Sequence, residues 1–496
     1  MARKTRLSYM IITVFFLILS FAAALLAGCD AAPEDPDWKG SGGKSAYELA
    51  VERGFQGTLD EWLDSLAGKN GQSAYELAVQ KGYQGSEEEF TAALLGKTDP
   101  SAKLMYISPD GSDDNDGLTA ESPKKTVAGC VEAGATRISA RRGVYREIVK
   151  LSEIGELEIF PTDHDMEYED GQYRHPIVFD TSDRLDVADL TEYGSLKRVC
   201  YVNDSNTQFD KVFIRKSLSP VVTEYGSRYN ATVWLFSEDE TAVRTKLKPV
   251  LTIEECQAQL NTFTYIDGYL YLNANMTDVA KIIVPTNWGN GFTVDGATRL
   301  VLKEVEVRFS GTYNMDIRNC AYFRLDQCSC KYTSYASGFH PVNANGILTA
   351  CYATGNFDGY GISGYGHTTF VDCVAEYNFD DGMSHHDGTT GTVFGGRYEG
   401  NGKGGVAPAY GARVNIYGGL YKNNAVFGIG YLSTEEAQAS GTVQNAILSG
   451  NAAGIRVDSG SNVVASGLLF FDNQTDRSLG SSAIFTEYGE DEKNTP

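Results

Sequence analysis

Carboxylate side chains recur at one fixed interval in the C-terminal half of the chain. Asn-Phe-Asp occurs as Asn356–Asp358 and again as Asn378–Asp380, and Asp381 follows directly. If successive turns of the chain stack in register, Asp358 lies about one strand spacing (~4.8 Å) from Asp380 and Asp381. Carboxylates this close repel one another, and they need a bound cation or a proton held by a raised pKa. Lys403, one interval later, can neutralise part of this charge, and Ca²⁺ with its oxygen ligands can supply the rest. The alternative is an exposed turn in which water screens the repulsion.

Histidines gather in the same segment. Four of the six lie between His340 and His386, and the run Gly382–Asp387 contains two of them. If Met383 points into the stack, alternation along a strand sends Ser384 and His386 outward. An outer strip that combines His, Asp, Lys, Arg and Tyr side chains has the groups that acid–base chemistry on carbohydrate requires. The residues expected to handle protons are His386, Lys403, Arg413, Asp387 and His385, and those expected to bind sugar are His340, His367, Tyr365 and Tyr410.

Two columns of this strip follow from the spacing. One contains His340, Ser363 and Ser384, and the other contains His367, Thr390 and Arg413.

The elements that position these residues are indicated by a repeat of 22 or 23 residues between Arg299 and Asn473. Self-similarity at a fixed period indicates stacked coils, each of which buries its apolar edge against its neighbours. Free cysteine packs as a small apolar residue, so a cysteine column predicts a buried thiol ladder without disulfides. Asparagines are expected to bond to one another at a turn. The columns are Cys328, Cys351 and Cys373; Asn356, Asn378, Asn401, Asn424, Asn451 and Asn473; and the apolar Ile362, Met383, Val406, Ile429 and Ile455.

The beginning of this region carries a fold resemblance. An Asp-rich turn at 106–117, a short helix near Val127–Ala133 and strand-like pieces over 136–147 follow one another. This order resembles the first coil of right-handed parallel β-helices of the pectate-lyase superfold, where a small helix caps the open end. The resemblance implies an all-β solenoid over 104–480, with irregular coils and insertions at 150–290 and regular coils at 299–473. The Asp-rich turn itself is expected to be structural, because Pro123 stands where an EF-hand loop needs glutamate.

Two enzyme families on that fold resemble the acidic run. Asp380–Ser384 resembles the calcium-binding stretch of family 9 pectate lyases, Asp-Asp-Gly-x-Asp, which has another Asp one coil earlier, as Asp358 is here. The resemblance implies Ca²⁺ bound by Asp358, Asp380, Asp381 and Ser384, although Ser384 replaces the family's last acid. It also implies a lysine that removes the proton α to a uronate carboxylate, for which Lys403 and Lys422 are candidates.

The second resemblance is to mannuronan C5-epimerases, which carry Gly-x-Asp-Pro-His-Asp. Gly382, His386 and Asp387 match this segment, while Ser384 and His385 replace its Asp and Pro. The loss of that Asp counts against epimerisation.

The N-terminus has the layout of an export signal. Basic residues precede an apolar run that ends in Leu26–Cys29, and this tetrapeptide resembles a bacterial lipobox. The resemblance implies a lipoprotein signal peptide at 1–28 and lipidation of Cys29, which would anchor the chain outside the cytoplasm at a bacterial membrane or cell surface. The alternative is an uncleaved transmembrane anchor. A flexible tether is predicted at 29–44, two 28-residue helical repeats at 45–98 and a polar tail at 481–496.

Charge and motifs exclude several partners. The net charge of −23 becomes −26 when the signal with Arg3, Lys4 and Arg6 is removed, and so acidic a protein repels nucleic acid. The glycines at 400, 402 and 405 fit a dinucleotide pattern but precede no helix, so no nucleotide site is expected. We expect a monomer that binds a polysaccharide.

These observations favour an extracellular, lipid-anchored polysaccharide lyase that acts by β-elimination on a uronate-containing glycan. A glycoside hydrolase on the same fold is the nearest alternative, because paired carboxylates can be acid and base. A non-catalytic glycan-binding or adhesin surface protein is the other, since solenoids also supply long faces without chemistry.

Overall fold

The computed structural model describes residues 103–162, 176–180, 182–200, 220–223, 226–229, 233–237, 243–266, 269–285 and 289–488. The predicted signal, Cys29, the tether, the helical repeats and the residues from 489 onward lie outside this range. Within the described part, no helix has the length and apolar character needed to cross a membrane.

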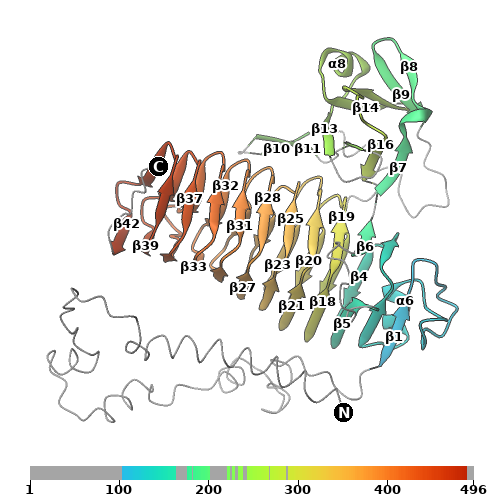
Figure 1. Ribbon diagram of the computed structural model, residues 1–496, viewed down its shortest axis with the longest axis horizontal. Helices are drawn as coiled ribbons and strands as arrows, with labels where there is room; N and C mark the ends of the chain where they lie inside the picture. The colour runs from blue at the N-terminus through green and yellow to red at the C-terminus, as the bar shows by residue number, and fades with distance from the viewer. Residues whose placement is uncertain are drawn as a thin grey trace, which may run out of the picture. The chain divides into compact units, whose positions relative to one another are not determined.

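Three parallel sheets form the solenoid, and the chain passes through them in a fixed order in each coil (Figure 1). Sheet A consists of β1 (Leu104–Ile107), β2 (Arg137–Ala140), β5 (Glu156–Pro161), β18 (Arg299–Lys303), β21 (Tyr322–Asp326), β24 (Gly346–Thr349), β27 (His367–Val371), β30 (Thr390–Phe394), β33 (Arg413–Tyr417), β36 (Ser440–Gln444), β39 (Asn462–Ser466) and β42 (Ile484–Tyr488). Sheet B consists of β3 (Gly143–Tyr145), β6 (Ile177–Asp180), β19 (Val305–Arg308), β22 (Ser329–Lys331), β25 (Tyr352–Thr354), β28 (Val374–Glu376), β31 (Arg397–Glu399), β34 (Leu420–Lys422), β37 (Ile447–Ser449) and β40 (Leu469–Phe471). Sheet C consists of β4 (Val149–Ser152), β17 (Phe292–Asp295), β20 (Met315–Arg318), β23 (Phe339–Val342), β26 (Tyr360–Ile362), β29 (Met383–His385), β32 (Gly404–Pro408), β35 (Phe427–Tyr431), β38 (Ala453–Val457) and β41 (Thr475–Leu479). This is the all-β parallel solenoid that the repeat predicted.

A short helix caps the first coil, as predicted. Helix α6 (Val127–Glu132) begins at Thr126, whose hydroxyl accepts the N–H of Gly129, and it buries Val127 and Cys130. The Asp-rich turn holds this cap in place, because the Asp113 carboxylate accepts the N–H groups of Lys125 and Thr126. The turn therefore has a structural role.

The segment expected to hold irregular coils with insertions contains both. Strands β4, β5 and β6 belong to the coils, and a large insertion follows them. After β6 the chain leaves the solenoid and builds an eight-stranded, mostly antiparallel sheet with its own buried core. When it returns, β17 pairs with β4, β18 with β5 and β19 with β6, so the coil that was interrupted is continued. The module contains β7 (Ser182–Asp186), η1 (Val187–Asp189), β8 (Thr191–Tyr193), β9 (Leu196–Cys200), β12 (Val233–Phe236), β13 (Val243–Pro249), α8 (Ile253–Ala258), β14 (Thr262–Ile266), β15 (Tyr269–Asn273) and β16 (Lys281–Pro285), beside the hairpin of β10 (Pro220–Thr223) and β11 (Gly226–Tyr229).

The asparagine column is a continuous hydrogen-bonded ladder at the turn from sheet B to sheet C. The Oδ1 of Asn401 accepts both the backbone N–H (3.1 Å) and the side-chain Nδ2 (3.0 Å) of Asn378. The same pair of bonds joins each member to the next, from Asn356 to Asn473. Buried amides need every one of these bonds, so the ladder fixes the vertical alignment of the coils.

The thiol column is confirmed as well. Cys328, Cys351 and Cys373 are buried and free, and each Sγ lies 3.4 Å from a carbonyl oxygen of the neighbouring coil.

The apolar column needs one correction. Met383, Val406, Ile429 and Ile455 are in register, but Met383 is aligned with Tyr360. The predicted member, Ile362, is aligned with His385. Ile362 lies only 21 residues before Met383, so it falls two places out of the column.

Replacing a ladder asparagine should destabilise the coils. Asn401→Ala leaves the Asn378 amide and several backbone groups unsatisfied, which costs about 2–3 kcal/mol in the free energy of unfolding, measured by urea denaturation. Asn462→Ala, at an exposed position in β39, is the matched control and should change it by less than about 0.5 kcal/mol. Equal losses in the two variants would contradict a role for the ladder in setting the register.

Candidate functional site

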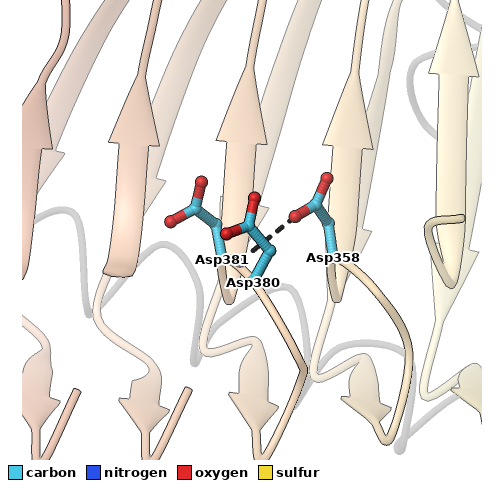
Figure 2. Close-up of side chains that lie close together, drawn as sticks. All are labelled: Asp358, Asp380 and Asp381. Atoms are coloured by element: carbon cyan, nitrogen blue, oxygen red, sulfur yellow. Dashed lines mark hydrogen bonds between the residues drawn. The ribbon is translucent and has the colours of Figure 1, made fainter. Parts of the chain in front are cut away.

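The three predicted acids do meet, at the point where two neighbouring coils enter sheet C. Asp358 lies just before β26, and Asp380 and Asp381 lie just before β29. One carboxylate oxygen from each lies within 4.8 Å of those of the other two. Figure 2 shows the three carboxyl groups side by side, with the N–H of Asp381 donating to Asp358 Oδ1 at 3.1 Å. The ladder causes this meeting, because Asp358 and Asp380 each follow a ladder asparagine by two residues.

Lys403 occupies the same position on the next coil, two residues after Asn401. Its Nζ lies 3.1 Å from Asp381 Oδ2 and 3.5 Å from Asp380 Oδ2. Burial works against the ammonium form, but attraction to Asp381 and Asp380 outweighs it and raises the pKa of Lys403 above its ordinary value. Lys403 therefore stays protonated and is poorly suited to act as a base.

The cluster holds three carboxyl groups beside one ammonium. Asp381 is only 2% exposed, and its Oδ1 has no hydrogen-bond partner. Burial raises the pKa of Asp381 to about 7, with repulsion from Asp380 adding to the shift and Lys403 opposing it. Burial and the repulsion of Asp381 and Asp380 also raise the pKa of Asp358. Ionisation of all three carboxyl groups would give the cluster a charge of −2, which a divalent cation would neutralise.

This donor set fits a divalent cation. Carboxylate oxygens are the ligands that Ca²⁺ prefers, and a buried carboxylate oxygen lacks a partner. The Oγ of Ser384, the fourth predicted ligand, is hydrogen-bonded to His386 Nε2.

His386 follows β29, whereas Asp380 and Asp381 precede it, and its ring is hydrogen-bonded to Ser384. Its ring is half-buried and 5.5 Å from the ring of Tyr410, centroid to centroid. Burial lowers the pKa of His386, although Asp387 opposes the shift. Charges of Asp380 and Lys403 also act on this ring. The imidazole of His386 is therefore uncharged at neutral pH. Asp387 itself is exposed, in a turn with φ of 59°.

His385, expected among the proton-handling residues, lies inside the coil. It is 0% exposed, packs edge-on against Phe370, and has a pKa lowered to about 3 by burial and by His386 and His367. A ring enclosed by the solenoid cannot contact a polysaccharide on the outer face. The cause is the alternation along β29, which sends Met383 and His385 inward.

Four other predicted site residues lie away from the cluster. The column of His367, Thr390 and Arg413 is confirmed, but it belongs to sheet A. Lys422 belongs to sheet B, where it pairs with Glu399. Tyr365 is 78% exposed in the turn between β26 and β27.

A second group of polar residues adjoins the first on sheet C. His340 is aligned with Asp316 of the preceding coil, and its Nδ1 lies 2.8 Å from Asp316 Oδ1. The ring of Tyr313 stacks on His340 at 3.7 Å. The predicted column of His340, Ser363 and Ser384 is only partly right, since Ser363 is aligned with Val342. Sequence reasoning missed Asp316 and Tyr313, although Asp316 lies one coil length before His340.

The inserted module contacts the coils next to the acids. Lys246 of β13 places its Nζ 3.3 Å from the ring centroid of Phe379, the residue before Asp380. Trp234 and Phe236 of β12 pack with Phe309 and Tyr332 of the solenoid.

Comparison with known proteins agrees with the fold. A family model described as a right handed beta helix region matches residues 268–420, and no curated protein matches the chain. Pectate lyase Pel9A is 13% identical over 80% of this chain and 82% of its own, with a TM-score of 0.41. The A-module of the Azotobacter vinelandii mannuronan C-5 epimerase AlgE6 is 17% identical over 40% of this chain and 64% of its own, with a TM-score of 0.26. A glycoside hydrolase is 10% identical over 78% of this chain and 96% of its own, with a TM-score of 0.32. The match to the family model and the three parallel sheets together show a right-handed parallel β-helix.

The raised pKa of Asp381 predicts a specific pH dependence. In the metal-free protein, the folded state holds a proton on Asp381 that the unfolded state releases near pH 3.8, so its stabilising contribution is complete below that pH and is lost as pH rises through about 7. Asp381→Asn keeps a neutral group at all pH values. We expect the variant to be more stable than wild type above pH 7, and the difference to disappear toward pH 4. Urea denaturation in EDTA across this range measures it, and a pH-independent difference would contradict the assignment.

Proposed function

We propose that this protein is a polysaccharide lyase that cleaves a uronate-containing glycan by β-elimination at the Asp358–Asp380–Asp381 cluster. The observation that supports it best is the meeting of three carboxyl groups within 4.8 Å of one another, one of which has a buried oxygen without a hydrogen-bond partner among the described residues. The sequence resemblance of Asp380–Ser384 to family 9 pectate lyases points to the same chemistry.

The cluster would hold Ca²⁺ through Asp358, Asp380 and Asp381. When bound, the cation neutralises the uronate carboxylate and so makes the α-proton more acidic. Lys403 adds a fixed positive charge at the same place, because its ion pairs with Asp380 and Asp381 keep it protonated.

His386 would accept the proton α to the carboxylate. Its pKa is lowered by burial, so the ring is uncharged and able to take a proton at neutral pH. The bond between the sugar and the leaving oxygen then breaks, and an unsaturated uronate remains. The leaving oxygen takes a proton from water, and the hydroxide that this forms takes the proton from His386, which restores the neutral ring. Tyr410, whose ring lies beside His386, would position the sugar.

The closeness of the acids disfavours the hydrolase alternative in its inverting form. Inverting enzymes need roughly 6.5–9.5 Å between acid and base to admit a water, whereas the oxygens here lie within 4.8 Å of one another.

The activity test follows the ultraviolet absorbance of unsaturated uronate in the full-length protein incubated with pectin, alginate or glycosaminoglycans. We expect absorbance to rise with one of these, to stop with EDTA and to return with Ca²⁺. Asp380→Asn and His386→Ala should each lower the rate by about 100-fold or more, the range lost with a general base or a charge-stabilising group.

Glu121→Gln, a matched loss of charge at an exposed position in the N-terminal turn, should retain the full rate. Circular dichroism verifies that each variant is folded. Absence of unsaturated product from all the glycans, with Ca²⁺ present, would refute the lyase and favour a glycan-binding surface protein.

We also propose that the enzyme works outside the cytoplasm, anchored to a bacterial membrane through lipidated Cys29. This proposal rests on the signal-like N-terminus alone. Expressed in a bacterial host, the wild type should incorporate labelled fatty acid and sediment with membranes, whereas Cys29→Ala should do neither. Equal labelling of both proteins would exclude Cys29 as the lipidated residue.

A further inference from the structure

Three residues on successive coils of sheet C form a hydrogen-bonded series of serine, histidine and carboxylate. Asp316 lies in β20, His340 in β23, and Ser363 directly after β26. His340 Nδ1 lies 2.8 Å from Asp316 Oδ1, and His340 Nε2 lies 3.4 Å from Ser363 Oγ. The imidazole thus joins a hydroxyl on one side to a carboxylate on the other.

The carboxylate at the end of the series is surrounded by hydrogen-bond donors. Asp316 is 1% exposed, and its second oxygen accepts hydrogen bonds from Asn290 Nδ2 at 2.6 Å and Arg318 Nε at 2.7 Å. An ionised carboxylate only accepts hydrogen bonds, so His340 must donate to it from Nδ1. In the neutral imidazole, Nε2 is then the acceptor, and Ser363 must donate its hydroxyl proton to it.

The imidazole is also fixed in orientation. Tyr313 stacks on it with the two ring planes 2° apart, and the ring is 8% exposed. Burial lowers the pKa of His340, although Asp316 opposes the shift. A neutral, oriented histidine behind a half-buried serine is the arrangement that activates a serine nucleophile.

The other serine–histidine pair on this face lacks, among the described residues, a carboxylate that accepts a hydrogen bond from the histidine. Ser384 and His386 are hydrogen-bonded to each other, but within the described coils the His386 ring donates no hydrogen bond to a carboxylate. Comparison of the two pairs therefore singles out Ser363.

The turn after Ser363 contains an exposed aromatic ring and a backbone donor without a partner among the described residues. The N–H of the following residue, Gly364, forms no hydrogen bond within the described coils, and it is a candidate donor to an oxyanion formed at Ser363. Tyr365, two residues after the serine, is exposed and offers an aromatic face to a sugar ring.

We propose that Ser363, His340 and Asp316 form a second catalytic site that hydrolyses acyl esters on carbohydrate. Ser363 Oγ attacks the ester carbonyl carbon while His340 Nε2 takes the hydroxyl proton. The bond to the sugar oxygen breaks, and His340 returns the proton to that oxygen. Water then attacks the acyl-serine with the help of the same imidazole, which releases the carboxylic acid and restores Ser363. The net reaction is ester plus water to alcohol plus acid.

Covalent labelling of the full-length protein tests this assignment. A fluorophosphonate probe should modify Ser363, as located by peptide mass spectrometry, and the protein should release acetate from 4-nitrophenyl acetate or an acetylated polysaccharide. Ser363→Ala should abolish both reactions. Asp316→Asn should slow them by about 10³-fold or more, because the wrong imidazole tautomer is then favoured.

The matched control is Ser384→Ala, which removes the serine of the incomplete pair and should leave labelling of Ser363 unchanged. Ser363→Ala should keep whatever β-elimination the wild type shows, and EDTA should not affect ester cleavage, so the two proposals can fail separately. Folding is verified by circular dichroism. A folded wild type that neither reacts with the probe nor cleaves either ester would overturn the proposal, as would a Ser363→Ala variant that reacts at the wild-type rate.

Discussion

The hydrogen-bonded ladder of buried asparagines is the interaction on which the rest of the solenoid depends. Each amide oxygen accepts two N–H groups from the neighbouring coil, so no coil can shift without leaving several buried polar groups unpaired. A shift of one residue would also exchange the inward and outward faces of every strand that follows. The ladder thus fixes, along the axis of the solenoid, the position at which each coil enters sheet C.

Charge is concentrated by this alignment. Two residues after each of three ladder asparagines (Asn356, Asn378 and Asn401) the chain carries a charged side chain. These are Asp358, Asp380 and Lys403, and the ladder places them at equivalent positions on three successive coils. Such a cluster costs stability, because burial and mutual repulsion both disfavour ionised carboxylates. Other buried carboxylates of the solenoid are neutralised by several partners, as Asp180 is by Arg146 and Arg308. The three acids beside Lys403 have one cationic partner among them in the part of the chain that the structure describes, which is why they stand out as a site for a cation.

Sheet C carries two distinct arrangements with different origins. The acidic cluster is built at the turns, where the ladder controls position. The series Ser363–His340–Asp316 is built on strand residues of successive coils, where direct pairing between β20 and β23 controls position. A polysaccharide lying along this face would pass both, so removal of acyl groups and cleavage of the backbone would occur on one surface.

The sequence by itself determined the parts of this protein that follow from a fixed period: the stacked coils, the thiol and asparagine columns, the capping helix, and the closeness of Asp358 to Asp380. These are properties of repetition and of strand alternation, and both can be counted along the chain. Only the tertiary structure decided that His385 is enclosed, that Arg413 lies on another sheet, that residues after β6 form a separate module and that Asp316 supports His340. The lengths of the turns between sheets and the ion pairs that side chains form after packing decide these features, and neither is periodic in the sequence.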